Sequence, residues 1–194
     1  MNRAARYAGG AIVAPRATAR ALVADDDKVP LAAVYVIGFA GLYSLTALGL
    51  YLRGWLPLSP PLPIDPHRWY LYQTLYTIPV AVAAVGLLVT IAHASVRGLG
   101  GRGSLPASLV VLGLGGVVPW VFFTWMPETV FAVTGHAPWP TWVDVTRQIV
   151  PAVWQLALCT VMLAVAHAVT WWKSGVAVLA GSIPFAFLFA FTIR

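Results

Sequence analysis

Five long stretches of the chain contain no charged side chain, and this pattern predicts the architecture. The uncharged stretches cover residues 29–52, 69–96, 103–127, 148–172 and 174–193. Because about 20 apolar residues span the roughly 30 Å hydrocarbon core of a bilayer as a helix, each stretch can cross a membrane once. We predict an all-α integral membrane protein with five transmembrane helices, at Leu31–Leu52, Tyr70–Val96, Leu105–Met126, Ile149–Trp172 and Val176–Ile193.

The distribution of Lys and Arg predicts the orientation of these helices. An odd number of spans places the two termini on opposite sides of the membrane. With the amino terminus inside, the inner segments hold eight Lys and Arg residues and the outer segments hold four. Since cytoplasmic loops carry an excess of positive charge, we expect a cytoplasmic amino terminus and an outside carboxyl terminus. The chain then divides into a cytoplasmic basic segment at 1–30 and a five-span membrane domain at 31–194.

The composition supports a membrane protein and excludes other classes. Hydrophobic residues make up 60% of the chain and charged residues 9%, against roughly 25% charged residues in soluble domains. The formal charge of +6 lies beside apolar runs, where it orients a membrane protein, so no nucleic-acid partner is expected. Membrane lipids are the expected partners, with Arg16, Arg20, Arg97 and Arg102 at lipid headgroups.

Pro15 predicts the start of a short helix in the basic segment, because proline is favoured at the first helical position. Such a helix places Arg16 and Arg20 on one side and residues 21–23 near the other. This pattern is typical of a segment that lies on a membrane surface. A flexible basic tail that only follows the orientation rule is the alternative.

His93 and His167 are the most specific polar feature of the spans. Each precedes a cytoplasmic cation, Arg97 or Lys173, by four to six residues, so both are expected at about the same depth. Two imidazoles at one level can ligate a b-type haem or help to hold a metal ion. They can equally form plain hydrogen bonds near the interface, and we therefore expect no cofactor and no metal.

Two further observations argue against an enzyme or an ion-coupled carrier. Within the predicted boundaries no span contains Asp, Glu, Lys or Arg, although pumps and carriers usually place a charged group in the membrane. The run Gly98-Leu99-Gly100-Gly101-Arg102-Gly103 fits a dinucleotide-binding pattern, but it joins two apolar spans instead of following a strand. We interpret it as a tight turn, and we assign no catalytic residue.

Small residues and prolines predict how the spans pack and bend. Gly113, Gly115 and Gly116 in span 3 let helix backbones approach closely, as do Gly38, Gly41 and Gly49 in span 1. This packing serves either the chain's own bundle or another subunit. Prolines inside spans remove a backbone donor and kink the helix; they are Pro79, Pro119, Pro151 and Pro184.

Spans 2 and 4 share a pattern that raises the hypothesis of an internal repeat. Pro79 precedes Ala92-His93-Ala94 at a distance similar to that between Pro151 and Ala166-His167-Ala168. Both helical hairpins would run in the same direction, which is a parallel repeat and not the inverted kind of many transporters. Chance similarity between apolar segments is the alternative.

Several short motifs follow one another in a characteristic order. They are Pro15-Arg16-Ala17-Thr18, the acidic step Asp25–Asp27, a long first outside loop, Ala92-His93-Ala94, Gly100-Gly101-Arg102-Gly103-Ser104, and a glycine-rich span with Pro119 before two further spans. Over about residues 12–193 this order resembles the Yip family, the Rab-interacting five-span proteins of eukaryotic Golgi membranes and their bacterial relatives. The resemblance implies a helical, non-enzymatic membrane protein that associates with itself or others.

The expected function is that of a non-enzymatic scaffold or assembly protein in a bacterial cytoplasmic (inner) membrane. It would act through helix packing and lipid contacts, with self-association or other membrane subunits as its protein partners. A passive translocator of lipid or small solutes is the first alternative, with the kinked spans as gates. A haem-bearing subunit of a membrane complex, with His93 and His167 as ligands, is the second.

Overall fold

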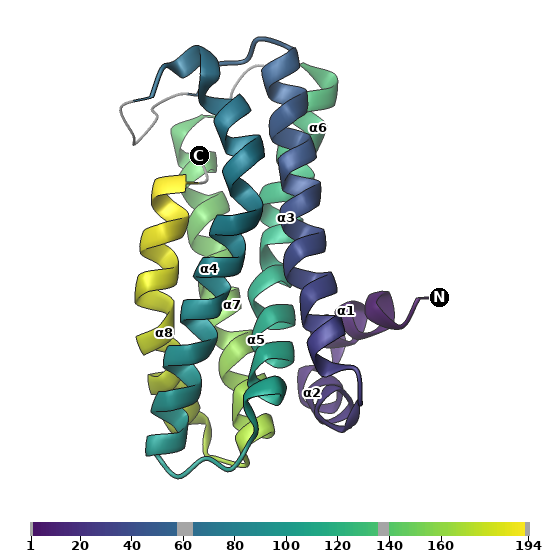
Figure 1. The fold of residues 1–194 in the computed structure, drawn as a ribbon, viewed down its shortest axis with the longest axis vertical. Helices are drawn as coiled ribbons and strands as arrows, with labels where there is room; N and C mark the ends of the chain where they lie inside the picture. The colour runs from purple at the N-terminus through teal and green to yellow at the C-terminus, as the bar shows by residue number, and fades with distance from the viewer. Residues whose placement is uncertain (1, 58–63, 136–139, 193–194) are drawn as a thin grey trace.

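The computed structural model describes residues 2–57, 64–135 and 140–192, and every regular element in these residues is a helix (Figure 1). The α-helices are α1 (Arg3–Val13), α2 (Pro15–Ala24), α3 (Lys28–Leu52), α4 (Trp69–Gly98), α5 (Leu105–Trp120), α6 (Met126–Thr134), α7 (Thr141–His167) and α8 (Trp171–Thr192). A 3-10 turn, η1 (Pro66–Arg68), precedes α4, and a π-helical turn, η2 (Val121–Trp125), joins α5 to α6.

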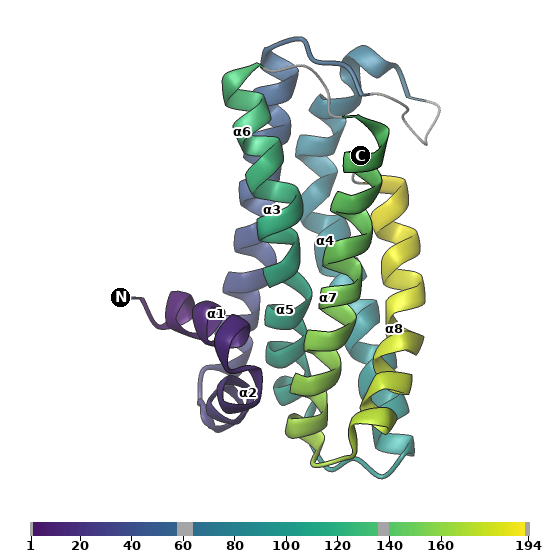
Figure 2. The same cartoon turned by 180° about the vertical axis from the view of Figure 1, so that it is seen from behind.

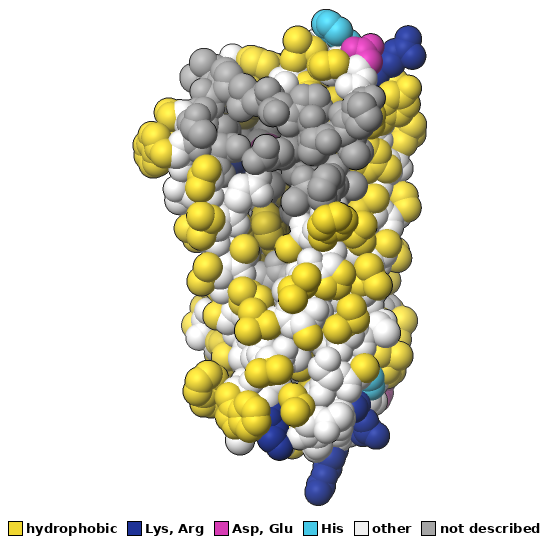
Figure 3. All heavy atoms as spheres, turned by 90° about the vertical axis from the view of Figure 1, so that its left-hand side faces the viewer, with side chains coloured by type: hydrophobic (Ala, Val, Ile, Leu, Met, Phe, Trp, Pro, Cys, Tyr) yellow, Lys and Arg dark blue, Asp and Glu magenta, His cyan; other side chains and the backbone are white. Residues whose placement is uncertain are grey.

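Within the described residues, five helical segments are long and apolar enough to cross a membrane, as predicted. They are Lys28–Leu52, Pro66–Gly98, Leu105–Thr134, Val145–His167 and Trp171–Leu188. They stand side by side in an elongated bundle, with the α4–α5 and α7–α8 turns at its lower end and the end of α3 and the start of α4 at its upper end (Figure 1). On the face shown in Figure 3, apolar side chains are spread over the described surface between the two ends, and the charged side chains gather at those ends. This is the arrangement of a multi-pass membrane protein.

The centre of the bundle is α5, which is buried along nearly its whole length. It packs against α3, α4 and α7, while α8 closes the bundle against α4 and α7. A Cβ placed on Gly113 would lie 3.5 Å from the Val36 side chain, and a Cβ placed on Gly115 would lie 3.1 Å from the Cys159 sulfur. The glycines of α5 therefore pack within the chain's own bundle, which is one of the two alternatives considered from the sequence.

Several predicted helix boundaries are wrong. The third span does not stop at Met126, because η2 and α6 carry the helix on to Thr134. The fourth helix starts at Thr141 instead of Ile149 and ends at His167, where Ala168 takes a left-handed conformation with φ 53°. Trp171 and Trp172 consequently begin α8 instead of ending α7.

The basic segment forms two short helices that pack against the bundle. As Figures 1 and 2 show, α1 and α2 lie beside its lower half. Pro15 opens α2 as predicted, and Arg16 and Arg20 are exposed. Leu22 is fully buried and belongs to the same core as α5 and α7. In the structure this segment is a packed part of the bundle instead of a flexible tail.

Candidate functional site

The two histidines singled out in the sequence meet at the lower end of the bundle. His93 on α4 and His167 at the end of α7 have ring centroids 5.2 Å apart. Ser108 on α5 joins them, because its Oγ lies 2.9 Å from His93 Nδ1 and 2.7 Å from His167 Nε2. We call His93, Ser108 and His167 the histidine–serine cluster; it ties three transmembrane helices together through neutral side chains.

The hydrogen bonds of the cluster indicate which nitrogen of His167 carries the proton. The Gly103 N–H donates to His167 Nδ1 at 3.2 Å, so this nitrogen is the acceptor of the neutral ring. Nε2 then carries the proton and donates a hydrogen bond to Ser108 Oγ. The Ser108 hydroxyl can in turn donate to His93 Nδ1 or to the Ser104 carbonyl, which lies 3.3 Å away. Both nitrogens of the His167 ring are thus hydrogen-bonded within the protein.

The glycine run between α4 and α5 is shaped by His167. A methyl group on Gly101 would lie 2.7 Å from His167 Nδ1 and 2.8 Å from the Val96 carbonyl oxygen. A methyl group on Gly103 would lie 2.9 Å from His167 Cδ2 and would overlap the Ala166 carbonyl. Gly100 has a φ of 95°, which favours glycine. The run is a tight turn, as predicted, and it also makes the close approach to the imidazole that hydrogen bonding requires.

This geometry does not favour haem ligation by the two histidines, and it does not make Ser108 a nucleophile. The facing nitrogens of His93 and His167 share one hydroxyl, so a porphyrin would have to separate α4 from α7. Ser108 has no exposed surface, and His167 presents a donor to it instead of a base. Among the residues the structure describes, no three His, Cys, Asp or Glu side chains lie close enough to hold a metal ion. The cluster is arranged to bind helices to one another.

A second polar group lies at the upper end of the bundle and was missed in the sequence. Arg147 on α7 is paired with Glu128 on α6, with Nη2 and Oε1 3.0 Å apart, and both side chains are largely buried, at 11% and 23% exposed. The buried Tyr43 hydroxyl on α3 also hydrogen-bonds Glu128. The third span continues through α6 and the fourth begins before Ile149, so these two spans include Glu128 and Arg147. The prediction of spans without charged residues is therefore wrong at this end.

Arg147 also explains how the helix continues through Pro127. Proline has no N–H to donate to the carbonyl four residues earlier, which here belongs to Phe123. Arg147 Nε donates to that Phe123 oxygen at 3.1 Å, and Nη2 donates to the Thr124 oxygen at 3.4 Å. The π-helical turn η2 lies at this point. The guanidinium therefore replaces a backbone donor and neutralises Glu128 at the same time. We call Tyr43, Glu128 and Arg147 the charged cluster.

Between the two ends, a cavity of about 250 Å³ opens between α5, α7 and α8. Its apolar wall includes Ala152, Phe185 and Ala186. Trp120 Nε1 donates to Gln155 Oε1 at 2.5 Å in the same wall, and Ser182 Oγ is buried there without a hydrogen-bond partner among the described residues. The buried Gln155 was not selected from the sequence, although an amide inside an apolar run is a readable signal.

The remaining predicted residues fall into two groups. The four prolines all lie inside helices, at Pro79, Pro119, Pro151 and Pro184. Arg97 and Arg102 are exposed at the lower end, where Lys173 Nζ donates to the Leu99 carbonyl at 2.8 Å. These exposed arginines are available to lipid headgroups, and that role stays a prediction. The parallel repeat also stays a prediction, since His93 lies within α4 whereas His167 ends α7.

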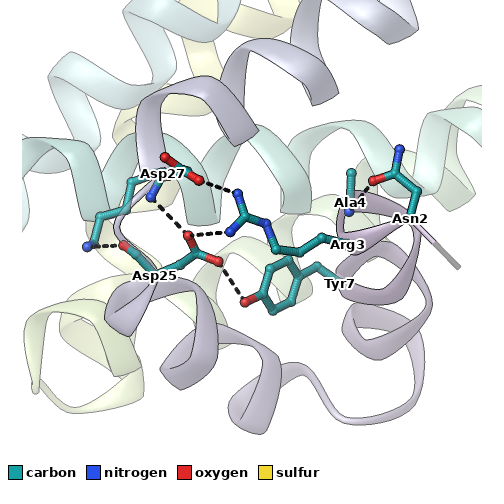
Figure 4. A network of polar contacts seen from close by, with 7 residues as sticks. Asn2, Arg3, Ala4, Tyr7, Asp25 and Asp27 are labelled. Carbon is teal, nitrogen blue, oxygen red and sulfur yellow. Dashed lines mark hydrogen bonds and ion pairs between the residues drawn. The ribbon is translucent and has the colours of Figure 1, made fainter.

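The amino-terminal helices are fixed by an acidic cluster (Figure 4). Asp25 accepts hydrogen bonds from the Tyr7 hydroxyl and the Asp27 N–H, both at 2.9 Å, and lies 3.5 Å from the Arg3 guanidinium. The Asp27 N–H and the Tyr7 hydroxyl together lower the pKa of Asp25 below its usual value of 3.8. Arg3 also pairs with Asp27, and that hydrogen bond raises the pKa of Arg3. The predicted acidic step is therefore the clamp that holds α1.

No protein-family model, curated protein or solved structure matches this chain. The resemblance to the Yip family rests on short motifs such as Ala92-His93-Ala94, and it stays a prediction. What the protein does is therefore inferred from its own contacts.

Proposed function

We propose that this protein is a non-enzymatic scaffold of a bacterial cytoplasmic membrane, which binds transmembrane helices of a second copy or of another subunit on the outward face of α3. The observation that carries the proposal is an open glycine surface on this helix. No described atom lies within 4 Å of a Cβ placed on Gly38, Gly41 or Gly49. The glycines of α5 are used inside the bundle, whereas Gly38 and Gly41 of α3 are left for a partner helix.

The surroundings of these glycines support the same interpretation. The outward face of α3 is apolar, and the large exposed side chains of this helix are Val29, Val34, Ile37, Leu42, Leu45 and Leu52. Close packing at glycines is a main source of helix association in a bilayer, where no hydrophobic force draws helices together. The helix α4 has two open glycines, Gly86 on its exposed side and Gly98 at its last residue, so only Gly86 lies within the apolar run. The α3 face is therefore favoured over the α4 face, and the resemblance to the Yip family supports this class of function.

Co-purification in mild detergent tests the proposal. Gly38→Leu places a bulky side chain on the open face without an internal clash, so the bundle is expected to fold while the partner or second copy is lost. Gly86→Leu is the matched control, because it makes the same change on the open side of α4. Equal recovery of partners with wild-type protein and Gly38→Leu would reject the α3 face as the binding surface.

The cavity beside Ser182 favours passive translocation as a second candidate function. It lies against α7 and α8, each of which contains a proline, Pro151 or Pro184, and it combines apolar walls with Gln155 and Ser182. Vesicles that carry the protein and a labelled lipid or a trapped dye test this function. Flux above that of empty vesicles, abolished by Ala186→Phe, would support translocation, and flux equal to that of empty vesicles would remove it.

A further inference from the structure

A groove at the upper end of the bundle has the chemistry of a lipid site. It runs between α3 and α6, which lie side by side in Figures 1 and 2, and has a volume of about 370 Å³. The α3 side of the groove is formed by Leu42, Leu45, Thr46, Gly49 and Arg53. The other side is formed by Trp125, Thr129, Ala132 and Val133. The groove is therefore apolar along its length with a cation at one end.

Arg53 supplies a positive charge that no described acidic side chain neutralises. One of its Nη atoms donates to the Val133 carbonyl at 2.9 Å, which holds the side chain at the end of the groove. No described acidic side chain forms an ion pair with Arg53. A guanidinium has five N–H donors, so most remain for an anion. Phosphate is the anion whose oxygens match this planar fork.

Trp125 forms the end of the groove opposite Arg53. Its Nε1 is buried and has no hydrogen-bond partner among the described residues, although Trp125 lines the groove. A buried N–H without an acceptor is unfavourable in a protein interior. The hydroxyls of Thr46 and Thr129 in the same groove already bond one another at 2.8 Å. Trp125 lies eight residues from Val133 along the helical run, about 12 Å, so its ring closes the end of the groove that is far from Arg53.

The length of the groove matches one lipid chain. From Arg53 to Leu42 the helix rises about 16 Å, at 1.5 Å for each residue. One leaflet of the hydrocarbon core is about 15 Å thick. We propose that the groove binds one anionic phospholipid, with its phosphate on Arg53 and an acyl chain along Gly49, Leu45 and Leu42. The far end of that chain lies against Trp125, which is one helical turn from Thr129 just as Leu42 is one turn from Thr46.

Native mass spectrometry of the purified chain tests this site, with phosphatidylglycerol and phosphatidylcholine as the probes. We expect one phosphatidylglycerol molecule to be retained at least tenfold better than phosphatidylcholine. Since a hydrogen bond to a charged group is lost, Arg53→Gln should lower this retention about tenfold. Gly49→Leu should lower it as strongly by filling the groove, because no described atom lies within 4 Å of its Cβ position.

Two matched controls and one spectroscopic readout make the test decisive. Gly86→Leu adds the same side chain on α4, and Arg68→Gln removes an exposed cation at the same end of the bundle. Both should retain the lipid like wild type. Titration with phosphatidylglycerol should shift the Trp125 indole N–H signal in the nuclear magnetic resonance spectrum, whereas inorganic phosphate should not. Equal retention of both lipids, unchanged retention in Gly49→Leu, or a shift caused by phosphate alone would overturn the proposal.

Discussion

The two ends of the bundle hold polar side chains in opposite ways. At the lower end, the histidine–serine cluster consists of neutral groups that satisfy one another inside the protein. At the upper end, the charged cluster pairs Arg147 with Glu128 and repairs the backbone at Pro127. Charges are costly within a membrane, and this pair lies near the ends of its helices. The difference shows that the lower end is held by hydrogen bonds between neutral groups and the upper end by an ion pair.

The largest effect is expected from breaking the charged cluster. Arg147→Met leaves Glu128 without its cation and the Phe123 carbonyl without its donor, which should reduce the free energy of unfolding by about 2–4 kcal/mol. Thermal unfolding in detergent measures this loss. The double variant Arg147→Met/Glu128→Met should recover part of it, because no unpaired charge remains. Additive losses in the double variant would contradict a coupled pair.

A smaller loss is expected from a single methyl group in the glycine turn. Gly101→Ala places the methyl within 3 Å of both His167 Nδ1 and the Val96 carbonyl, so the free energy of unfolding should fall by about 2–3 kcal/mol. Gly98→Ala is the control, because no described atom lies within 4 Å of its Cβ position. Equal melting temperatures for the two variants would show that the turn does not need to approach His167.

Removing the hydroxyl of Ser108 separates the hydrogen bonds from the packing of the lower end. Ser108→Ala leaves nitrogens of His93 and His167 without their shared partner, at an expected cost of about 1–2 kcal/mol. Ser44→Ala is the matched control, since the Ser44 hydroxyl is buried without a partner among the described residues. Its removal should leave stability unchanged or slightly higher. A larger loss in Ser44→Ala than in Ser108→Ala would contradict the cluster.

The smallest effect is expected at the amino-terminal clamp, and it depends on pH. The pKa of Asp25 is lowered in the folded chain, so its contribution is present above its usual pKa of 3.8 and is lost as the pH falls through the lower folded value. The Tyr7 ring signals in the nuclear magnetic resonance spectrum should change below pH 3.8. Asp25→Asn should abolish this titration, whereas Asp26→Asn, which changes an exposed neighbour, should keep it. A midpoint at or above 3.8 would contradict the clamp.

The lower end could be predicted from the sequence more fully than the upper end. His93 and His167 stand out because each lies in an uncharged run just before a cation, and the structure brings them together. Ser108 was missed because a serine near the start of a span carries no signal of its own. Its role depends on α4 and α7 meeting α5, which is a tertiary contact.

The upper end could not be predicted because its local signals point the other way. Pro127 followed by Glu128 is typical of a helix end, and the charged residues around Arg147 are typical of a loop. The helix continues because a distant guanidinium takes the place of the missing backbone donor. Local patterns thus predicted the five crossings, while the ends of two helices were decided by a contact between them.

The proposed function depends on the outward face of α3 being the surface that binds a partner helix. A photo-crosslinking amino acid at Ile37 tests this most directly, with Val82 on α4 as the control, since the two side chains are 47% and 46% exposed. Crosslinking in native membranes should give a discrete protein adduct from position 37 that Gly38→Leu removes, and none from position 82. Lipid adducts alone at position 37, or equal protein adducts at both positions, would contradict the account.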